Sequence, residues 1–306
     1  MKIAIIGRTE VLYETLLYLN DEGYEIVGIL TAKEAPEYLI KASDFEEFAK
    51  LNFIPFAYGG KIDNYRDFLK TLNADIAISI NYPGIISQGI IDLFPLGILN
   101  VHGGDLPKYR GNACQAWAII NGENRIGLCV HKMIGGELDS GDIISRDYFE
   151  IDLDTKITEV LEWIRQSTPT MIKEALIRLS YDPSYVLEIQ SSDITKTLRC
   201  YPRKPEDGII SWNKDSISII RLINACNKPY AGAFCHFKGD KLIIWDARLS
   251  ENDEPFSAIP GQITKIAPNH VEVACGKGKI MVSNIEYLGK LQNPTNLIKS
   301  IRERLT

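Results

Sequence analysis

Short apolar runs alternate with segments of helical period through the N-terminal part of the chain. Buried-strand patterns lie at residues 2–6, 24–30, 53–56, 75–80 and 97–101. Helical periodicity lies between or after them, at residues 9–20, 44–51, 64–72 and 113–121. Strands that alternate with helices in this way predict an α/β fold with a Rossmann-like, doubly wound and mostly parallel sheet. Ligands of such sheets bind beyond the carboxyl ends of the strands.

The pattern changes after a long helical segment at residues 154–179. A proline-marked connector follows, and beyond a helix at 214–226 come short strand patterns at 231–236, 241–248, 261–266, 271–275 and 279–285. Strands at this spacing predict a second, smaller OB-like β-barrel domain, which a helix at 296–303 would close. We therefore expect a Rossmann-like domain at 1–181, a linker at 182–207 and a barrel domain at 208–306.

The net charge of the 306-residue chain is −6, and it is unevenly distributed. Residues 1–181 hold 17 Lys and Arg against 26 Asp and Glu, a net −9, whereas residues 182–306 hold 17 against 14, a net +3. Proteins that grip a nucleic-acid backbone carry a clear basic patch, so this balance argues against a nucleic-acid partner. No apolar run reaches the ~18 residues of a membrane span, and the start M-K-I-A-I-I-G is a strand rather than a signal peptide.

The six cysteines show neither C-x-x-C pairing nor zinc-ligand spacing, and a disulfide framework is not expected in a chain of this length. We therefore predict no metal site and a reducing, cytoplasmic location. Gly7 alone follows the first strand, where a dinucleotide would need G-x-G-x-x-G, so NAD binding is not expected.

The stretch that concentrates chemistry is N-V-H-G-G-D-L-P-K-Y-R-G-N-A-C-Q-A-W, which begins at Asn100. Asn100 and His102 end a predicted strand, and alternation puts both on one face. A second apolar run at 126–134 leads into Gly135 and Gly136, so Asp139 lies on a loop that can bend back toward His102. An amide, an imidazole and a carboxylate can then meet in one cleft.

The pattern N-x-H-x(4)-P-x-Y-R-G, with D-S-G following 37 positions after the histidine, resembles the formyltransferase family that uses 10-formyltetrahydrofolate. The resemblance implies that formyl donor, with Asn100, His102 and Asp139 as catalytic residues. It also implies a folate pocket lined by Tyr82, Pro83, Gly84, Asn112, Gly135, Gly136, Glu137 and Leu138. The family often has Ser-Leu-Leu-Pro where this chain has G-D-L-P, so we name Asp105 as a candidate substrate residue.

The second domain carries resemblance too. Y-P-R-K-P-E-D-G-I-I-S-W from Tyr201 and N-K-P-Y-A-G-A-F from Asn227 are similar to the barrel domain of this family, and the first is most similar to the formyltransferase domain acting on UDP-4-amino-4-deoxyarabinose. A nucleotide-linked acceptor would need stacking and phosphate contacts. The candidates are Trp212 and Tyr230 for the nucleobase, and Arg203 and Lys204 for the pyrophosphate. The alternative for each aromatic is a core side chain, which is its usual place in a small barrel.

Formyl transfer to an amine needs proton transfers and a donor for the oxyanion of the tetrahedral intermediate. His102 suits the proton transfers because its reference pKa lies near neutrality, and its contribution is typically ~10²–10⁴-fold. The Asn100 amide can donate to the oxyanion, and Asp139 can orient His102 and favour its protonated form. The alternative is that all three satisfy turns and core hydrogen bonds. For His131, inside an apolar run, we predict a satisfied core histidine.

We therefore predict a sugar N-formyltransferase for surface polysaccharide synthesis, acting on a small nucleotide-linked amino-deoxy sugar. A methionyl-tRNA formyltransferase is the alternative enzyme, but the basic insertion usual in that branch is missing. Residues 31–43 carry Lys33 and Lys41 offset by Glu34 and Glu37. A non-catalytic folate-binding sensor is a further alternative. We expect no nucleic-acid or membrane partner, and the number of subunits, including a homodimer, is left open.

Overall fold

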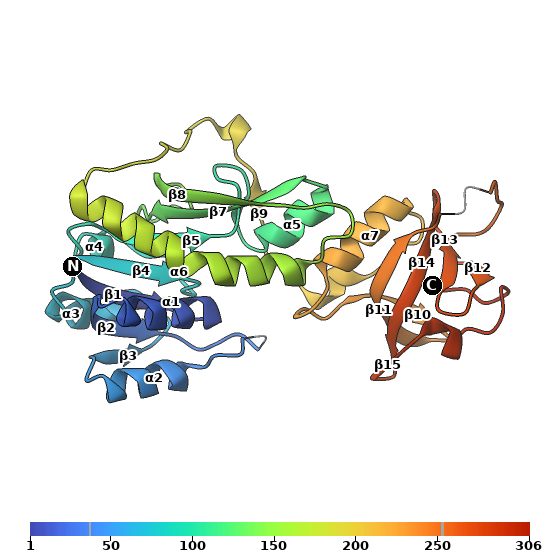
Figure 1. Cartoon of the computed structure of the whole chain (residues 1–306), viewed down its shortest axis with the longest axis horizontal. Coiled ribbons are helices and arrows are strands. Elements are labelled where there is room, and N and C mark those ends of the chain that lie inside the picture. Colours follow the sequence, from blue (N-terminus) through green and yellow to red (C-terminus); the bar gives the residue numbers. More distant parts are fainter. Residues whose placement is uncertain (37, 252–253) are drawn as a thin grey trace. The chain divides into compact units, whose positions relative to one another are not determined.

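Residues 1–36, 38–251 and 254–306 are described by the computed structural model, and they form two units (Figure 1). The first unit comprises Met1–Cys114, Ile126–Phe149 and Leu161–Cys200, and the second Gln115–Arg125, Glu150–Val160 and Tyr201–Thr306. Two internal segments of the predicted first domain thus group with the C-terminal unit, and the domain boundaries at 181 and 207 stay a prediction. Glu37, counted above in the segment 31–43, lies outside the described residues.

A seven-stranded sheet forms the centre of the first unit, in the order β3-β2-β1-β4-β5-β7-β8. Strands β3 to β5 in this order pair in parallel, whereas β7 runs antiparallel to β5. The predicted mostly parallel α/β sheet is therefore confirmed. The strands are β1 Lys2–Gly7, β2 Glu25–Thr31, β3 Phe56–Tyr58, β4 Ile76–Ile80, β5 Ile98–His102, β7 Arg125–Lys132 and β8 Ile143–Glu150.

The helices follow the predicted periodicity within a few residues at most of their ends. Helix α1, for example, buries Leu12, Leu16 and Leu19 on one face, with Thr9 as its N-cap. The helices are α1 Glu10–Asp21, α2 Ala42–Leu51, α3 Arg66–Thr71, α4 Gln88–Ile91, α5 Cys114–Asn121, α6 Ile157–Tyr181 and α7 Ser216–Ala225, and the 3₁₀ turns are Ile62–Tyr65, Ile194–Lys196, Pro205–Gly208 and Pro294–Asn296.

The strand predicted at 53–56 begins later than expected. Phe53 is 95% exposed and has a φ of 56°, so it belongs to the turn after α2. Pairing with β2 starts only at Phe56. In the sequence, an aromatic residue in the turn after a helix cannot be told apart from one that begins a strand.

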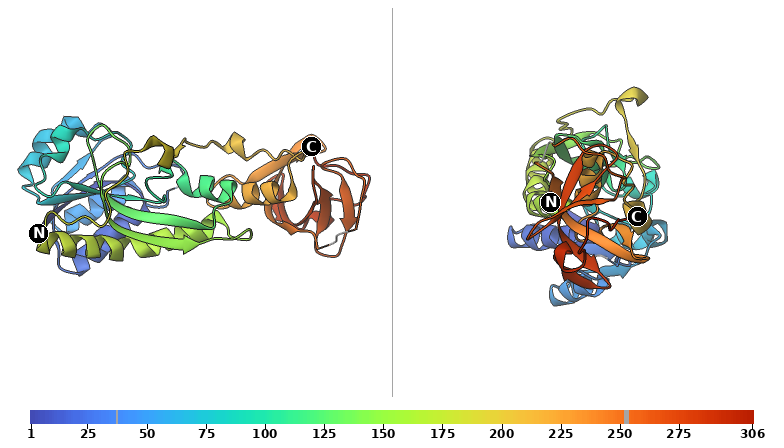
Figure 2. Two further views of the ribbon diagram at one scale, coloured as in Figure 1. Left: turned by 90° about the horizontal axis from the view of Figure 1, so that it is seen from above. Right: turned by 90° about the vertical axis from the view of Figure 1, so that its right-hand side faces the viewer.

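The second unit is built on an antiparallel sheet in the order β10-β11-β14-β13-β12, with β15 paired to β14. Figure 2 shows its strands curving around a common interior, which apolar side chains of the sheet and α7 fill. The smaller β-rich domain is thus confirmed. Its strands are β10 Ala233–Phe237, β11 Asp240–Leu249, β12 Ile263–Ile266, β13 Val271–Ala274, β14 Lys279–Tyr287 and β15 Lys290–Gln292.

The helix predicted at 296–303 is wrong. The chain after the 3₁₀ turn Pro294–Asn296 forms turns and then pairs with both edges of the sheet. His236 of β10 exchanges backbone hydrogen bonds with Thr306 at 2.7 and 2.9 Å, and the Leu305 N–H donates to the carbonyl of Gly261, before β12, at 2.8 Å. Unpaired edge strands invite association, so this segment protects two edges at once.

The segment predicted as a linker, 182–207, is in part bound to the first unit. Glu188 pairs with Ile143, and β9 (Arg199–Cys200) pairs in parallel with β6 (Arg110–Gly111).

Among the described residues, no helix combines the length and hydrophobicity that crossing a membrane requires.

Candidate functional site

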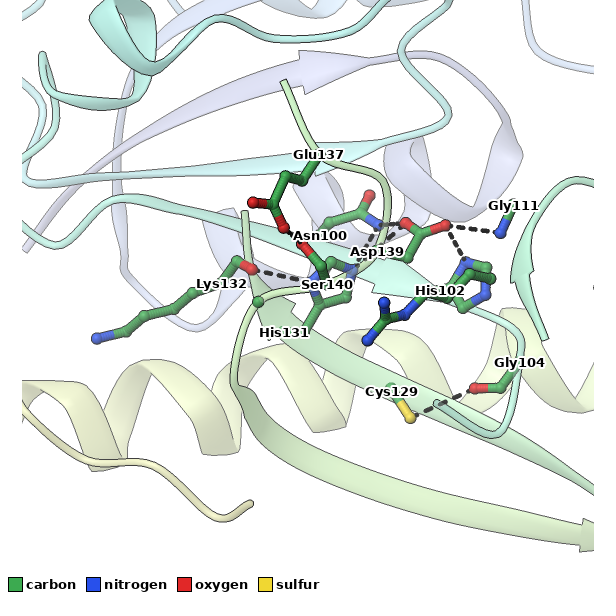
Figure 3. A network of polar contacts seen from close by, with 12 residues as sticks. Asn100, His102, Gly104, Gly111, Cys129, His131, Lys132, Glu137, Asp139 and Ser140 are labelled. Carbon is green, nitrogen blue, oxygen red and sulfur yellow. Dashed lines mark hydrogen bonds and ion pairs between the residues drawn. The ribbon is translucent and has the colours of Figure 1, made fainter. Parts of the chain in front are cut away.

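Asn100 and His102 leave β5 on the same face, and the neighbouring strand brings a second histidine beside them. In the antiparallel pairing of β5 and β7, Asn100 lies opposite His131 and His102 lies opposite Cys129. The imidazole rings of His102 and His131 meet edge to face, with their centroids 6.5 Å apart. Figure 3 shows Asn100, His102 and His131 converging with Asp139, which comes from the loop after β7.

The Asp139 carboxylate lies at the centre of the cluster. Its Oδ2 accepts a hydrogen bond from the Gly111 N–H at 2.9 Å and lies 3.5 Å from His102 Nδ1, and its Oδ1 lies 3.4 Å from Asn100 Nδ2. Burial alone would raise the pKa of this carboxyl, but the His102 and His131 rings and the Gly111 N–H outweigh it and hold the pKa well below its ordinary value. Asp139 is therefore ionised at neutral pH. The three residues predicted as catalytic thus meet in one place.

The tautomer of His102 follows from its partners. Its Nε2 lies 2.7 Å from the carbonyl oxygen of Tyr109, which can only accept, so Nε2 carries a proton. The nitrogen left to gain or lose a proton is Nδ1, the one that faces Asp139. Gly104 is needed beside the ring, because a Cβ there would lie 2.5 Å from His102 Nε2.

His131 is buried and hydrogen-bonded, as predicted for a satisfied core histidine, and it also contacts the candidate catalytic residues. Its Nδ1 donates to the carbonyl of Lys132 at 2.9 Å, so in the neutral ring Nε2 accepts the hydrogen bond from Asn100 Nδ2 at 3.0 Å. His131 Nε2 also lies 3.6 Å from Asp139 Oδ1. The ring therefore fixes the orientation of the Asn100 amide. Only the strand register reveals this role, and the register is not readable from the sequence.

Asp105 pairs with another side chain of the same unit and does not face an open site. Its Oδ1 pairs with Arg146 Nη1 at 2.5 Å, and Arg146 Nη2 also donates to the Leu106 carbonyl at 2.7 Å and to Glu188 Oε2 at 2.9 Å. The Arg146 side chain is only 9% exposed. The observed ion pair therefore fixes the loop between His102 and Tyr109, and the expected role in substrate binding receives no support from its geometry.

The residues implied for the folate pocket lie mainly on two loops that touch each other. The Gly136 N–H donates to the carbonyl of Ile86 at 3.3 Å, and the Gly135 N–H donates to Gln88 Oε1 at 2.9 Å. Gly135 has a packing reason to lack a side chain, because a Cβ would lie 2.2 Å from the Gln88 nitrogen. Gly136 differs: its φ is +78° and no atom lies within 4 Å of its missing Cβ.

The remaining implied pocket residues are less constrained. The Tyr82 hydroxyl donates to the Gly59 carbonyl at 2.9 Å, and burial raises its pKa to about 12, so it stays a neutral phenol. Glu137 accepts from the Ser140 hydroxyl at 2.6 Å. Exposed or half-buried positions are occupied by Pro83, Gly84, Asn112 and Leu138.

Trp212 is not a stacking surface for a nucleobase. It is 6% exposed and belongs to the apolar core of the C-terminal unit, which is the alternative considered from the sequence. Arg203 lies over the Trp117 ring at 5.1 Å and donates to the Asp207 carbonyl at 3.1 Å. Tyr230 is 38% exposed and Lys204 is exposed. For the last three, a role in substrate binding stays a prediction.

Among the described residues, no group of three or more His, Cys, Asp or Glu side chains is arranged to hold a metal ion. All six cysteines are buried and free. The absence of a metal requirement stays a prediction that a chelator can test.

Comparisons with known proteins place these features in a family. The model of the family described as "Formyl transferase" matches residues 1–176, and that of "Formyl transferase, C-terminal domain" matches residues 203–302. The bifunctional polymyxin resistance protein ArnA of Wigglesworthia glossinidia brevipalpis is 29% identical, over 99% of this chain and 47% of its own length. The chain therefore spans about half of that relative.

A methionyl-tRNA formyltransferase of Acetivibrio thermocellus is equally similar, at 29% identity over 94% of this chain and 92% of its own length. Among solved structures, WlaRD, described as a sugar 3N-formyl transferase in the presence of dTDP and 5-N-formyl-THF, superposes with a TM-score of 0.69. It is 18% identical and covers 95% of this chain and 98% of its own, a likeness that shows the fold alone. The two matching family models cover most of the chain, which therefore belongs to the formyl transferase family, folate-dependent enzymes whose formyl donor is 10-formyltetrahydrofolate.

Proposed function

We propose that the chain is a sugar N-formyltransferase, which moves a formyl group from 10-formyltetrahydrofolate to the primary amine of a nucleotide-linked amino-deoxy sugar. A dTDP- or UDP-linked 4-amino sugar is the favoured acceptor, in the synthesis of a surface polysaccharide such as a lipopolysaccharide O-antigen. The observation that carries the formyl-transfer chemistry is the cluster in which Asn100 and His102 both lie within 3.5 Å of the Asp139 carboxylate.

In this proposal His102 accepts the amine proton at Nδ1, because Nε2 is already committed to the Tyr109 carbonyl. Asp139 faces Nδ1 and remains charged, so it stabilises the imidazolium that forms. The same proton is then available for the folate nitrogen as it leaves. Such a general acid–base group contributes ~10²–10⁴-fold to the rate.

Asn100 supplies the donor for the developing oxyanion. Its amide nitrogen already contacts His131 Nε2 at 3.0 Å and Asp139 Oδ1 at 3.4 Å. The second contact is long for a hydrogen bond and therefore weak. We expect the oxyanion to replace that contact while His131 keeps the amide oriented. Removing a donor of this kind elsewhere costs ~10²–10³-fold in kcat.

The two loops beside the cluster fit a flat, folate-type ligand in one structural respect. The space at Gly136 is open, and a Cβ at Gly84 would meet nothing nearer than 3.5 Å, so backbone polar groups there are within reach of a ligand. Tyr82 lies between Asn81 and Pro83 at the end of β4, on the carboxyl edge of the sheet. When bound there, 10-formyltetrahydrofolate supplies the formyl group.

The choice of a sugar over a transfer RNA rests on charge. Residues 1–181 carry a net −9, and the segment 31–43 has Lys33 and Lys41 opposed by Glu34 and Glu37. A nucleic-acid substrate needs several phosphate contacts from Lys and Arg. Methionyl-tRNA formyltransferase is the second candidate, because a relative with that name is as similar to this chain as ArnA is. A folate-binding sensor, the third, would not need all of Asn100, His102 and Asp139.

A formylation screen tests the proposal. Purified protein and 10-formyltetrahydrofolate are incubated with dTDP-, UDP- and GDP-linked amino sugars, and with methionyl-tRNA in parallel, and products are identified by mass spectrometry. We expect formylation of at least one nucleotide-linked amino sugar and little of the transfer RNA. A transfer-RNA rate comparable with the best sugar would move the assignment to the second candidate, and folate binding without any transfer would favour the sensor.

The proposal implies a small-molecule acceptor and neither a nucleic-acid nor a membrane partner. A cytoplasmic location stays a prediction for cell fractionation, and light scattering would decide whether a homodimer forms.

A further inference from the structure

Asp139 holds a backbone conformation that is uncommon for a residue other than glycine. Its φ is 49°, in the left-handed region that residues other than glycine rarely adopt. The loop between β7 and β8 also contains three glycines, Gly135, Gly136 and Gly141, each of which widens the range of conformations open to the free loop. Contacts from outside the loop therefore help to hold Asp139 in place.

Gln190, in the segment predicted as a linker, makes such contacts. Its side-chain Nε2 donates to the Asp139 carbonyl at 3.0 Å and to the Gly141 carbonyl at 2.6 Å. Its Oε1 accepts from Arg110 Nη2 at 2.8 Å, so the amide nitrogen and oxygen are both used. Gln190 is 8% exposed. A buried amide with these partners fixes the backbone on both sides of Ser140.

The same segment supports the Asp139 side chain by a second route. Nine residues after Gln190, β9 begins and pairs with β6. Within β6, the Gly111 N–H donates to Asp139 Oδ2 at 2.9 Å. Arg110, the other residue of β6, is the one that donates to Gln190. Residues 190–200 thus anchor both the backbone and the carboxylate of Asp139.

We infer that Gln190 is a positioning residue for Asp139: it holds the carboxylate where it faces His102 Nδ1. For its effect on turnover, this inference rests on the proposed function. Without the two donated hydrogen bonds, the loop gains freedom, and the carboxylate spends less time at the histidine. The chemical step is then slowed, although Gln190 itself touches no reacting atom.

Two variants separate the parts of the side chain. Gln190→Glu keeps its length and an acceptor for Arg110 but has no N–H to give to the Asp139 and Gly141 carbonyls. Gln190→Ala removes all contacts. The matched control is Gln166→Ala, which changes an exposed glutamine of α6 whose amide donates to Glu162 of the same helix.

We expect kcat to fall about 10–100-fold in both Gln190 variants, as for other residues that orient a catalytic group through a hydrogen bond. KM for the acceptor should change by less than about threefold, since Gln190 is none of the residues proposed to bind it. In an Asp139→Asn background, Gln190→Glu should have little further effect, because the carboxylate it positions is already gone. Wild-type kcat in Gln190→Glu, or losses that multiply fully in the double variant, would overturn the inference.

Amide hydrogen exchange gives a reading that needs no acceptor. The Gly111 N–H is protected by Asp139 Oδ2, so its exchange should speed up about tenfold or more in both Gln190 variants, while amides of β1 and β4 and the Gln166→Ala control stay at wild-type rates. If the wild-type protein formylates no amine, the proposed function fails and this exchange alone decides the inference, with unchanged Gly111 protection refuting it. If Gln190→Ala loses protection throughout the chain, Gln190→Glu is the deciding variant.

Discussion

Replacing Asp139 with asparagine removes one charge and nearly preserves the shape of the side chain. The new amide oxygen can still accept from the Gly111 N–H, so we expect the loop to keep its place. Asp139 Oδ2 lies 3.5 Å from His102 Nδ1, and two unit charges at that distance attract by roughly 5 kcal/mol at an effective dielectric constant of about 20. Solvation offsets part of this attraction. We therefore expect kcat to fall by about 10²–10⁴-fold, or about 3–5 kcal/mol in the barrier.

The assay is the initial rate of formyl transfer to the best acceptor, from about pH 5.5 to 9, across the range in which a histidine titrates. It compares wild type with Asp139→Asn, His102→Ala, Asn100→Ala and the His102/Asp139 double variant. His102→Ala should nearly abolish turnover, and the double variant should be hardly slower than His102→Ala alone, as for residues that act as one unit. Asn100→Ala should slow the reaction without moving its pH profile, because an amide does not titrate. Melting curves should show that all variants fold. Wild-type kcat in Asp139→Asn, or fully additive losses, would refute the mechanism.

The pKa of Asp139 is held below its ordinary value, so its contribution to the free energy of unfolding is present above about pH 4 and is lost as pH falls through the folded pKa. The urea midpoint of Asp139→Asn should therefore drop less on acidification than that of the wild type. Asp105→Asn should lower the free energy of unfolding by about 1–3 kcal/mol, because the largely buried Arg146 loses one of its two carboxylate partners. A large rise in the acceptor KM without lost stability would instead indicate that Asp105 binds the substrate. Burial raises the pKa of Cys129 to about 11 and of Cys235 to about 12, so these thiols should react with a disulfide reagent at neutral pH only after unfolding. Dialysis against a chelator should leave turnover unchanged, and recovery of a lost rate with zinc or magnesium would contradict this.

The fold class was predictable because strand and helix burial leave a periodic trace in the sequence. Apart from Lys2 at the start of β1 and the buried Ser79 in β4, both strands are apolar, as expected for strands covered on both faces. The C-terminal tail left no such trace. Its apolar residues suggested a helix, whereas its backbone pairs with His236 and Gly261 on the two edges of the sheet. Which strands lack a partner is decided by the whole sheet, so a local pattern cannot show where a tail will pair.

In the candidate site, too, some residues could be predicted from the sequence and others could not. Asn100, His102 and Asp139 could be named because their types and spacing form a recognisable motif, and the structure brings them together. The partners that orient them come from elsewhere. His131 reaches Asn100 through strand register, and the Tyr109 carbonyl reaches His102 through a loop with a left-handed residue. Neither partner is marked by its residue type, since any histidine in a strand and any carbonyl would look the same in the sequence.

Asp105 and Trp212 illustrate the opposite error. Their residue types suggest contacts with a ligand, but both side chains make their contacts within the protein. A carboxylate in a loop beside a catalytic histidine and an aromatic in a barrel are both consistent with substrate contacts. The structure pairs Asp105 with Arg146 and buries Trp212 in the core. Fixed polar partners restrict the conformations that a side chain can adopt. This restriction helps a site that must keep a charge close to an imidazole, because the charge is then already in place when the reaction begins. The positive φ of Asp139 and its supports from Gln190 and Gly111 fit this reasoning: the carboxylate is placed by the backbone around it, and a motif can identify the group without showing what holds it.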